Sequence, residues 1–301
     1  MAHSFRTEER NTFLKTRPVR VGRISYMNVA PVYYGLNNGH KPSWMEMVSA
    51  PPSTLNAMLA AQELDVSPVS SAAYARHQDD WLLLPDLSIS CFGEVMSVLL
   101  VSRRPLADLS GKRVILTRES ATAAALTRYL LTSSGIAPRF DTGRIRCARD
   151  LPADSDAALV IGDAALKEKW RSCFDYVWDL GALWRERTGL PFVFALWAVR
   201  RSYAEARPER VRAVMNQFRR SRCEGERNIQ GIRCEASARL GIQTETCRRY
   251  YDRLHYSLNA LQIRGLHRFF AGLRREGLIP KPVTLSFFDE DSRLYAEGHA
   301  A

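Results

Sequence analysis

The apolar positions of this chain fall into short continuous runs, separated by stretches in which apolar residues recur at helical spacing. Residues 19–24 (VRVGRI) form the first run and predict a short buried strand. Ser53 can cap a helix whose apolar positions follow the 3.6-residue period and which we expect to end near Leu64. Residues 65–69 predict the next strand. Alternation of this kind is typical of an α/β protein with a mostly parallel sheet.

The middle of the chain repeats the pattern. Residues 96–102 (MSVLLVS) are a continuous apolar run of strand length, which we interpret as a strand that crosses between two lobes. A second strand–helix unit follows, with a strand at 113–116 and a helix that opens near Ser120. Residues 157–162 predict a further strand, and the run at 191–199 (PFVFALWAV) predicts the return to the first lobe.

These patterns predict two lobes, because 301 residues exceed what a single hydrophobic core usually holds. The crossings are expected near Ser102 and Phe194, and the chain beyond the second crossing is expected to be helical, with Gly277 ending the last helix. Ligands of such sheets bind beyond the carboxyl ends of the strands, so a ligand cleft is expected between the lobes. The expected division is a polar tail (1–18), a discontinuous first lobe (19–102 and 195–301) and a second lobe (103–194).

The chain carries a formal net charge of +11, which raises the question of a nucleic-acid partner. Its densest basic stretch, residues 200–275, intersperses arginine with glutamate and has helical apolar spacing. This pattern favours a solvated helical face over a nucleic-acid surface, although it leaves the latter open. The excess positive charge would attract a small anionic substrate, which is the partner we expect in place of nucleic acid.

The sequence also bears on location and cofactors. The first 18 residues lack the apolar stretch of a secretory signal, and no run approaches the roughly 20 apolar residues that span a bilayer, so we expect a cytoplasmic protein without membrane contact. Six cysteines are scattered without a CxxC pair or a histidine at ligand spacing. We therefore expect reduced thiols and no metal, and the lack of a Gly-rich phosphate loop indicates no nucleotide cofactor.

Polar residues at strand ends are the first candidates for a site. Asn28 lies just past the first strand, where its amide can both donate to and accept from a polar ligand; alternatively it forms an Asx-turn before Pro31. Ser97 interrupts an apolar run, so its hydroxyl needs a partner on burial. That partner is either a ligand or a neighbouring carbonyl.

Polar residues near helix starts are the second group of candidates. Ser120 and Thr122 lie where free backbone N–H groups and the helix dipole favour an anion, although plain N-capping explains them as well. Asp163 follows a strand and precedes a helical segment, so it is either an N-cap or a cleft residue. Glu94 is either a general base or a solvated loop carboxylate, and the second reading is favoured.

Several segments together resemble the chorismate dehydratase family, and the likeness covers nearly all of residues 19–278. The resemblance implies the fold of a type II periplasmic binding protein without the export signal. It also implies a lyase that dehydrates chorismate to 3-[(1-carboxyvinyl)oxy]benzoate in menaquinone biosynthesis by the futalosine pathway. The segments that carry it, in the family's order and spacing, are VGRISYMNVAPVYYGL, ELDVSPVSSAAYA, LLLPDLSIS, FGEVMSVLLVS, GKRVILTRESATAAAL, ALVIGDAAL and DLGALWRERTGLPFVFALWAV.

The resemblance also implies roles for residues. Asn28 matches an active-site asparagine of the family, and Ser97 becomes a donor to a substrate carboxylate, so these two are the expected catalytic residues. Ala123 stands where the family usually has a second hydroxyl, which puts one substrate contact in doubt. The alternative function is a non-catalytic binding protein for a small aromatic carboxylate. The residues expected to bind substrate are Ser25, Ser70, Ser71, Ser120, Thr122 and Asp163.

Overall fold

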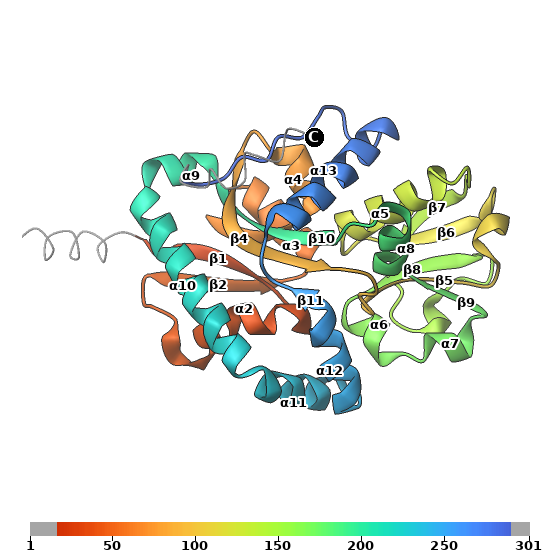
Figure 1. The fold of residues 1–301 in the computed structure, drawn as a ribbon, viewed down its shortest axis with the longest axis horizontal. Helices are drawn as coiled ribbons and strands as arrows, with labels where there is room; N and C mark the ends of the chain where they lie inside the picture. Colours follow the sequence, from red (N-terminus) through yellow and green to blue (C-terminus); the bar gives the residue numbers. More distant parts are fainter. Residues whose placement is uncertain (1–16, 290–301) are drawn as a thin grey trace, which may run out of the picture.

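The strands form two separate sheets, which make up the two lobes seen side by side in Figure 1. The structure is a computed structural model and describes residues 17–289. The expected polar tail, 1–18, lies almost wholly outside this range. The first sheet has the order β11 (Leu254–His255), β4 (Trp81–Cys91), β10 (Phe192–Arg200), β3 (Val66–Ser70), β1 (Val19–Ile24), β2 (Met45–Ala50). The second has the order β7 (Arg139–Gly143), β6 (Arg113–Thr117), β8 (Ala157–Ile161), β5 (Val98–Ser102), β9 (Tyr176–Asp179).

The continuous apolar runs became the buried strands of these sheets. β1 has the predicted bounds, and β3, β6, β8 and β10 differ from their predicted ranges by one or two residues at an end. All residues of β3 and β8 are buried, as expected for strands covered on both faces. The two-lobed α/β fold is therefore confirmed.

Both sheets are mixed, which corrects the expectation of a mostly parallel arrangement. β1 pairs in parallel with β2 and β3, but β10 runs antiparallel between β3 and β4. In the second sheet β6 pairs in parallel with β7 and β8, whereas β5 is antiparallel to β8 and β9. β5 and β10, by which the chain enters each lobe, are antiparallel to both of their neighbours, and the short β11 is antiparallel to β4.

The crossings between lobes come earlier in the chain than expected. β5, which the sequence placed at the end of the first lobe, pairs with β8 and β9 of the second sheet. All of β10 pairs in the first sheet, from Phe192 opposite Cys91 to Arg200 opposite Trp81. The first crossing is thus the segment 92–97 and the second is the segment 189–191, in place of positions near Ser102 and Phe194. An apolar run marks a strand but does not show which sheet it joins.

Helices cover the faces of the sheets, with α4 and α13 above the first sheet and α2 and α11 below it in the view of Figure 1. The helix capped in the prediction by Ser53 instead starts at Pro52, because proline is favoured at the first helical position, and it ends at Ala60 rather than near Leu64. The long helix expected to end at Gly277 is interrupted by β11. The α-helices are α2 (Ala30–Gly35), α3 (Pro52–Ala60), α4 (Ser71–His77), α5 (Ala121–Thr132), α6 (Asp163–Lys167), α7 (Trp170–Cys173), α8 (Leu180–Thr188), α9 (Arg201–Ala206), α10 (Pro208–Arg227), α11 (Ile229–Leu240), α12 (Thr244–Arg253) and α13 (Ala260–Arg275). The shorter helical turns are η1 (Met27–Val29), η2 (Leu36–His40), η3 (Leu106–Leu109) and η4 (Ala148–Asp150).

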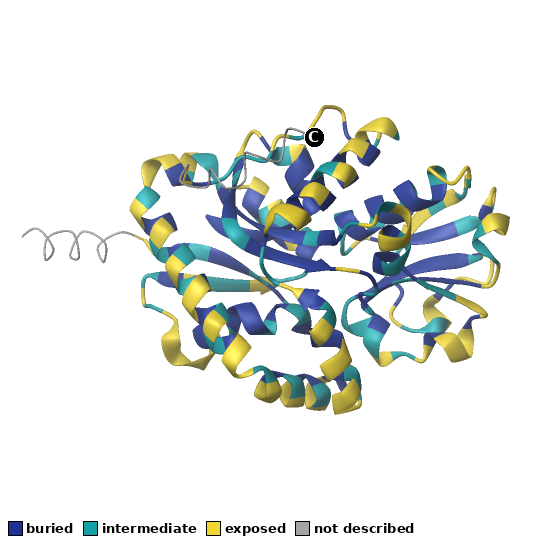
Figure 2. Ribbon diagram, in the orientation of Figure 1, coloured by how far each residue is buried: buried dark blue, intermediate teal, exposed yellow. Residues whose placement is uncertain are grey.

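A buried core runs through each lobe along its sheet, as the dark strands in Figure 2 show. Where the second crossing enters the first lobe, an aromatic cluster joins the lobes. The ring of Trp184 on α8 meets the ring of Phe192 edge to face at a centroid distance of 5.1 Å, and Phe269 on α13 lies 4.9 Å from Phe192. This cluster packs the return strand firmly into the first lobe.

The basic helices have the solvated face that the sequence favoured. Many of their arginines pair with carboxylates, for example Arg220 with Glu224 and Arg222 with Asp86. Within residues 17–289, no helix combines the length and the apolar character needed to cross a bilayer.

Candidate active site

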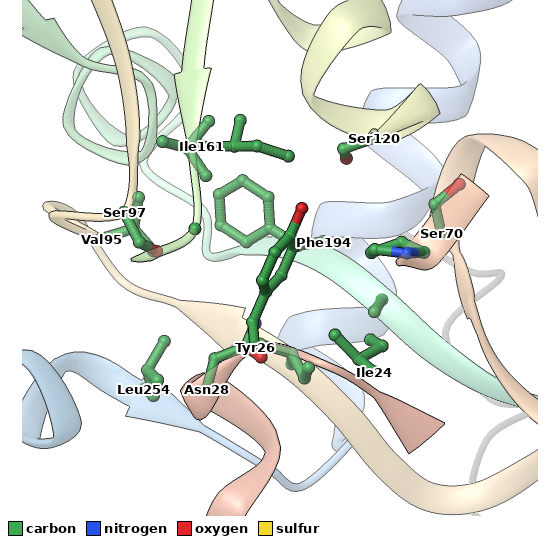
Figure 3. A pocket seen from close by; sticks show the side chains of 15 residues that line it. Ile24, Tyr26, Asn28, Ser70, Val95, Ser97, Ser120, Ile161, Phe194 and Leu254 are labelled. Atoms are coloured by element: carbon green, nitrogen blue, oxygen red, sulfur yellow. The ribbon is translucent and has the colours of Figure 1, made fainter. Parts of the chain in front are cut away.

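A pocket of about 570 Å³, measured with its opening to solvent, lies between the two lobes. Its walls come from the ends of β1, β3 and β8, from the crossing segment 92–97 and from the start of α5, so both lobes contribute. Figure 3 shows Tyr26 standing among the lining side chains. The lining residues are Ile24, Tyr26, Asn28, Pro52, Ser70, Ile89, Val95, Ser97, Val98, Ser120, Ile161, Gly162, Phe194, Ala195 and Leu254.

The lining contains no Lys, Arg, His, Asp or Glu. Its polar side chains are one amide, three serine hydroxyls and the phenol of Tyr26, on otherwise apolar walls. An anion bound here is therefore held by hydrogen-bond donors and helix-terminal dipoles, which orient a ligand without adding a full charge. This arrangement suits a flat, partly apolar molecule with carboxylates at its edges.

A hydrogen bond fixes the backbone of Asn28, whereas the side-chain oxygen of Asn28 has no partner among the described residues. It lies in the short turn η1, directly after β1, and its carbonyl accepts a hydrogen bond from the Tyr256 hydroxyl at 2.9 Å. Its Oδ1 is buried and has no partner among the described residues. A buried amide oxygen without a partner costs free energy unless a ligand supplies one. The structure thus favours a ligand contact over a closed Asx-turn.

Ser97 is presented to the pocket by a constrained segment. The buried carboxylate of Asp179 accepts hydrogen bonds from the N–H groups of Val95 and Met96, the latter at 2.6 Å. Met96 has a φ of 64°, a left-handed conformation that non-glycine residues rarely adopt. Ser97 itself is only 5% exposed, and its carbonyl accepts from the Gly162 N–H at 2.8 Å, which continues the pairing of β5 with β8.

Asp179 is a site-shaping residue that the sequence analysis did not single out. It also caps α8 by accepting from the N–H of Gly181 at 2.9 Å. Burial raises the pKa of Asp179, and its backbone hydrogen bonds oppose that rise. The sequence contained a signal, because an aspartate followed by a helical pattern is a favoured N-cap.

Ser70 and Ser120 both lie at helix starts and line the pocket from opposite lobes. The Oγ of Ser70 accepts from the N–H of Ala73, and the Oγ of Ser120 accepts from the N–H of Ala123 at 3.2 Å. Both hydroxyls act as acceptors in these caps, so each keeps its hydrogen for a second partner. Capping and ligand binding are therefore compatible at both positions.

Four other expected site residues do not line this pocket. The Ser71 hydroxyl donates to the Val193 carbonyl at 2.7 Å, and Thr122 Oγ1 accepts from the Ala72 N–H at 3.0 Å, so both hydroxyls join structural elements. Ser25 pairs through its backbone N–H with β2. Ala123 is buried within α5 and does not line the pocket either.

Asp163 is the fourth expected site residue that does not line the pocket. The cap of α6 is Gly162, and Asp163 is the first residue of the helix, so the N-cap expectation is wrong. Its carboxylate accepts from the Met27 N–H at 3.3 Å and thereby links the lobes next to the pocket. Burial raises the pKa of Asp163.

Tyr26 is the main lining residue that sequence reasoning missed. Its hydroxyl donates to Glu119 across the cleft at 2.5 Å, and Arg144 pairs with the same carboxylate at 2.6 Å. Burial raises the pKa of Tyr26 further above its usual value. Its place at the end of β1, two residues before Asn28, was the available signal.

No group of three or more His, Cys, Asp or Glu side chains placed to hold a metal ion occurs in residues 17–289. The polar groups that the pocket offers are instead the neutral donors described above.

Two lobes of mixed α/β structure with a pocket between them are the fold of the periplasmic solute-binding proteins. The sulphonate-binding protein SsuA of Escherichia coli shares this fold, with a TM-score of 0.58 at 15% identity over 89% of this chain and 90% of that one. The profile of the menaquinone biosynthesis family matches residues 19–275, and the chain belongs to this family.

Two enzymes are similar to this chain over most of its length. The chain is 35% identical to chorismate dehydratase of Thermus thermophilus over 272 residues, which is 85% of this chain and 96% of that one. It is 31% identical to 1,4-dihydroxy-6-naphtoate synthase of the same organism over 209 residues, or 67% of this chain and 72% of that one. The resemblance seen in the sequence motifs is thereby confirmed.

Proposed function

We propose that this protein is a cytoplasmic chorismate dehydratase that converts chorismate to 3-[(1-carboxyvinyl)oxy]benzoate. The observation that carries the proposal is the likeness to the Thermus enzyme over nearly its whole length. The shorter and weaker likeness to the naphtoate synthase makes that activity the second candidate. An uncharged pocket with an unpaired amide oxygen supports a substrate that has both carboxylates and a hydroxyl.

The reaction removes a proton from the ring carbon that bears the enolpyruvyl ether and hydroxide from the neighbouring carbon. Negative charge from the lost proton spreads through a ring double bond onto the ring carboxylate, and loss of hydroxide then makes the ring aromatic. Preorganised donors around that carboxylate lower the barrier. We assign this task to Ser120 and the N-terminal amides of α5.

The pocket lining supplies no histidine, lysine or carboxylate as a base. We propose that the enolpyruvyl carboxylate of the substrate takes the proton, held by the Asn28 amide and the Ser97 hydroxyl, and that the proton leaves with hydroxide as water. The unpaired Asn28 Oδ1 accepts from the ring hydroxyl before it departs. Proximity in a pocket that excludes bulk water replaces a strong protein base.

Incubating the pure protein with chorismate tests the proposal. We expect many equivalents of chorismate to be consumed, with a new aromatic absorbance and a product lighter by one water, and with no effect of added EDTA. Binding of chorismate without turnover would instead support the binding-protein alternative. Failure to consume or bind chorismate would leave the naphtoate synthase activity as the candidate.

Replacing the nearby carboxylates tests the absence of a protein base. Glu94 is paired with Arg253 at 2.9 Å, and Asp163 accepts from a backbone N–H. We expect Glu94→Gln and Asp163→Asn each to keep turnover within about tenfold of wild type. Removal of a general base would instead lower turnover about 10²–10⁴-fold. If either variant binds chorismate normally and is inactive, that carboxylate is the base.

The pH dependence of turnover follows from the same lining. Tyr26 is its one titratable side chain, and burial raises the pKa of Tyr26, so the phenol stays protonated across the neutral range. Carboxylates of ordinary pKa, about 4, are ionised above pH 5.5. We therefore expect kcat to be flat from about pH 5.5 to 9. A bell-shaped profile with a limb near pH 6–7 would indicate a protein base instead.

A further inference from the structure

Two tyrosines near the end of α12 bond to consecutive backbone carbonyls of the Asn28 turn. The Tyr251 hydroxyl donates to the Met27 carbonyl at 2.8 Å, and the Tyr256 hydroxyl donates to the Asn28 carbonyl at 2.9 Å. These contacts span more than 220 residues of sequence. Both donors therefore fix the turn from outside its own strand.

The same segment also reaches the crossing that carries Ser97. Arg253, the last residue of α12, donates through Nε to Glu94 at 2.9 Å, and Glu94 belongs to the crossing segment 92–97 that carries Ser97. One short stretch of chain thus contacts both the turn of Asn28 and the segment of Ser97, the two residues to which we assign the enolpyruvyl carboxylate.

This stretch is itself fastened to the first sheet. β11 pairs with β4, with Leu254 opposite Cys91 and His255 opposite Ser90. The Ser88 N–H donates to the Tyr256 carbonyl at 2.9 Å, which anchors the residue whose side chain holds Asn28. The phenols therefore project from a rigid support, as accurate placement of a site requires.

We propose that Tyr251 and Tyr256, which we name the tyrosine brace, are positioning residues that hold the Asn28 amide at its distance from the Ser97 hydroxyl. The proposal rests on the dehydratase function. A phenylalanine would fill the same space at each position, so the packing of the brace does not require the hydroxyls. Their partners are the Met27 and Asn28 carbonyls, which ties the hydroxyls to the site.

The members of the brace differ in how much they control. The Met27 carbonyl also accepts from the Ala30 N–H, so it keeps a partner when the Tyr251 hydroxyl is removed. Tyr256 acts on the backbone of Asn28 itself. We expect the loss of turnover to be larger for Tyr256→Phe than for Tyr251→Phe.

Steady-state kinetics of the two variants with chorismate test the proposal. We expect Tyr256→Phe to lower kcat about 30-fold with KM within about threefold, since a displacement of about 1 Å can cost 10²-fold. The matched control is Tyr74→Phe, because Tyr74 is fully buried and its hydroxyl bonds to the backbone of residues 284 and 286, outside the pocket lining. This control should lose comparable thermal stability and keep wild-type kcat.

A double variant separates positioning from general structural support. In the Asn28→Asp background, Tyr256→Phe should lower kcat by less than threefold, because the group that it positions is already impaired. The proposal is overturned if Tyr256→Phe alone stays within threefold of wild type, if Tyr74→Phe loses kcat equally, or if the double variant shows the full product of both losses. Inactive wild-type protein would refute the dehydratase function, whereas active wild type with unaffected brace variants would refute this inference alone.

Discussion

Asn28→Asp is expected to fold with nearly wild-type thermal stability and to turn over chorismate at least about a hundredfold more slowly. Aspartate keeps the size of the side chain but replaces the two donor hydrogens of the amide with negative charge, next to the proposed position of a substrate carboxylate. Repulsion should weaken binding by about 1–4 kcal/mol. The loss of alignment should persist at saturating substrate, so the fall in kcat is the deciding measurement.

Asn216→Asp provides the matched control, because it makes the same change of charge on an exposed residue of α10. It should leave both kcat and KM unchanged. If Asn28 only formed a turn, aspartate would serve nearly as well, since both residues form Asx-turns. Near-wild-type turnover of Asn28→Asp would therefore remove the central residue of the site.

Asp65→Asn is expected to cost about 3 kcal/mol of unfolding free energy at pH 7, as for other buried ion pairs that lose one partner. The Asp65 side chain is 1% exposed and accepts from Arg17 at 2.7 Å and from Arg200 at 2.8 Å. It also accepts from the Arg20 N–H. Asparagine would leave the largely buried guanidinium of Arg200 without its counter-charge. Urea unfolding of wild type and Asp65→Asn measures the difference in unfolding free energy.

The effect of this substitution depends on pH in a defined direction. Burial alone would raise the pKa of Asp65, but hydrogen bonds from Arg17, Arg20 and Arg200 outweigh it and hold the pKa below its usual value. The stabilisation is thus present above the unfolded pKa, about 3.9, and is lost as pH falls through the folded pKa. The difference in unfolding free energy between wild type and Asp65→Asn should be largest at pH 7 and should become smaller below about pH 4.

Asp79→Asn is a control for the loss of a carboxylate on the surface. The side chain of Asp79 is 71% exposed and pairs with Lys281. Solvent-exposed ion pairs contribute little to the free energy of unfolding. An equal loss of stability in both variants, or a gap for Asp65→Asn that does not change with pH, would contradict the assigned role of Asp65.

Strands that are buried on both faces were predictable because their apolar runs are continuous. β2 and β4 were missed for different reasons. β2 alternates irregularly between buried and exposed positions, whereas β4 contains Pro85 and Asp86, with a φ of 56° at Asp86, and pairs with β10 through two shifts of register. The insertion of β10 between β3 and β4 depends on contacts over more than 100 residues, which local periodicity does not encode.

The site was predictable where a polar residue ends a strand or starts a helix. Asn28, Ser70 and Ser120 satisfy that rule and line the pocket. Ser97 lines it too, but was predicted because its hydroxyl interrupts an apolar run. Ser71 and Thr122 satisfy it too, but distant partners use their hydroxyls. These contacts arise only when α4 packs on β10, which supplies the Val193 carbonyl to Ser71, and on α5, which carries Thr122. The tyrosine brace was missed for the same reason, since nothing near Tyr256 in the chain points to Asn28.

The order of strands in the first sheet has a consequence for synthesis on the ribosome. β10 separates β3 from β4, yet about 100 residues, including every strand of the second sheet, are made between the end of β4 and the start of β10. Because the ribosome adds about 5–20 residues per second, the edges of β3 and β4 that pair with β10 lack their partner for roughly 5–20 s. The second lobe, encoded in one continuous stretch, can fold during this interval. Nascent chains of this protein should therefore depend on chaperones in the window before β10 emerges.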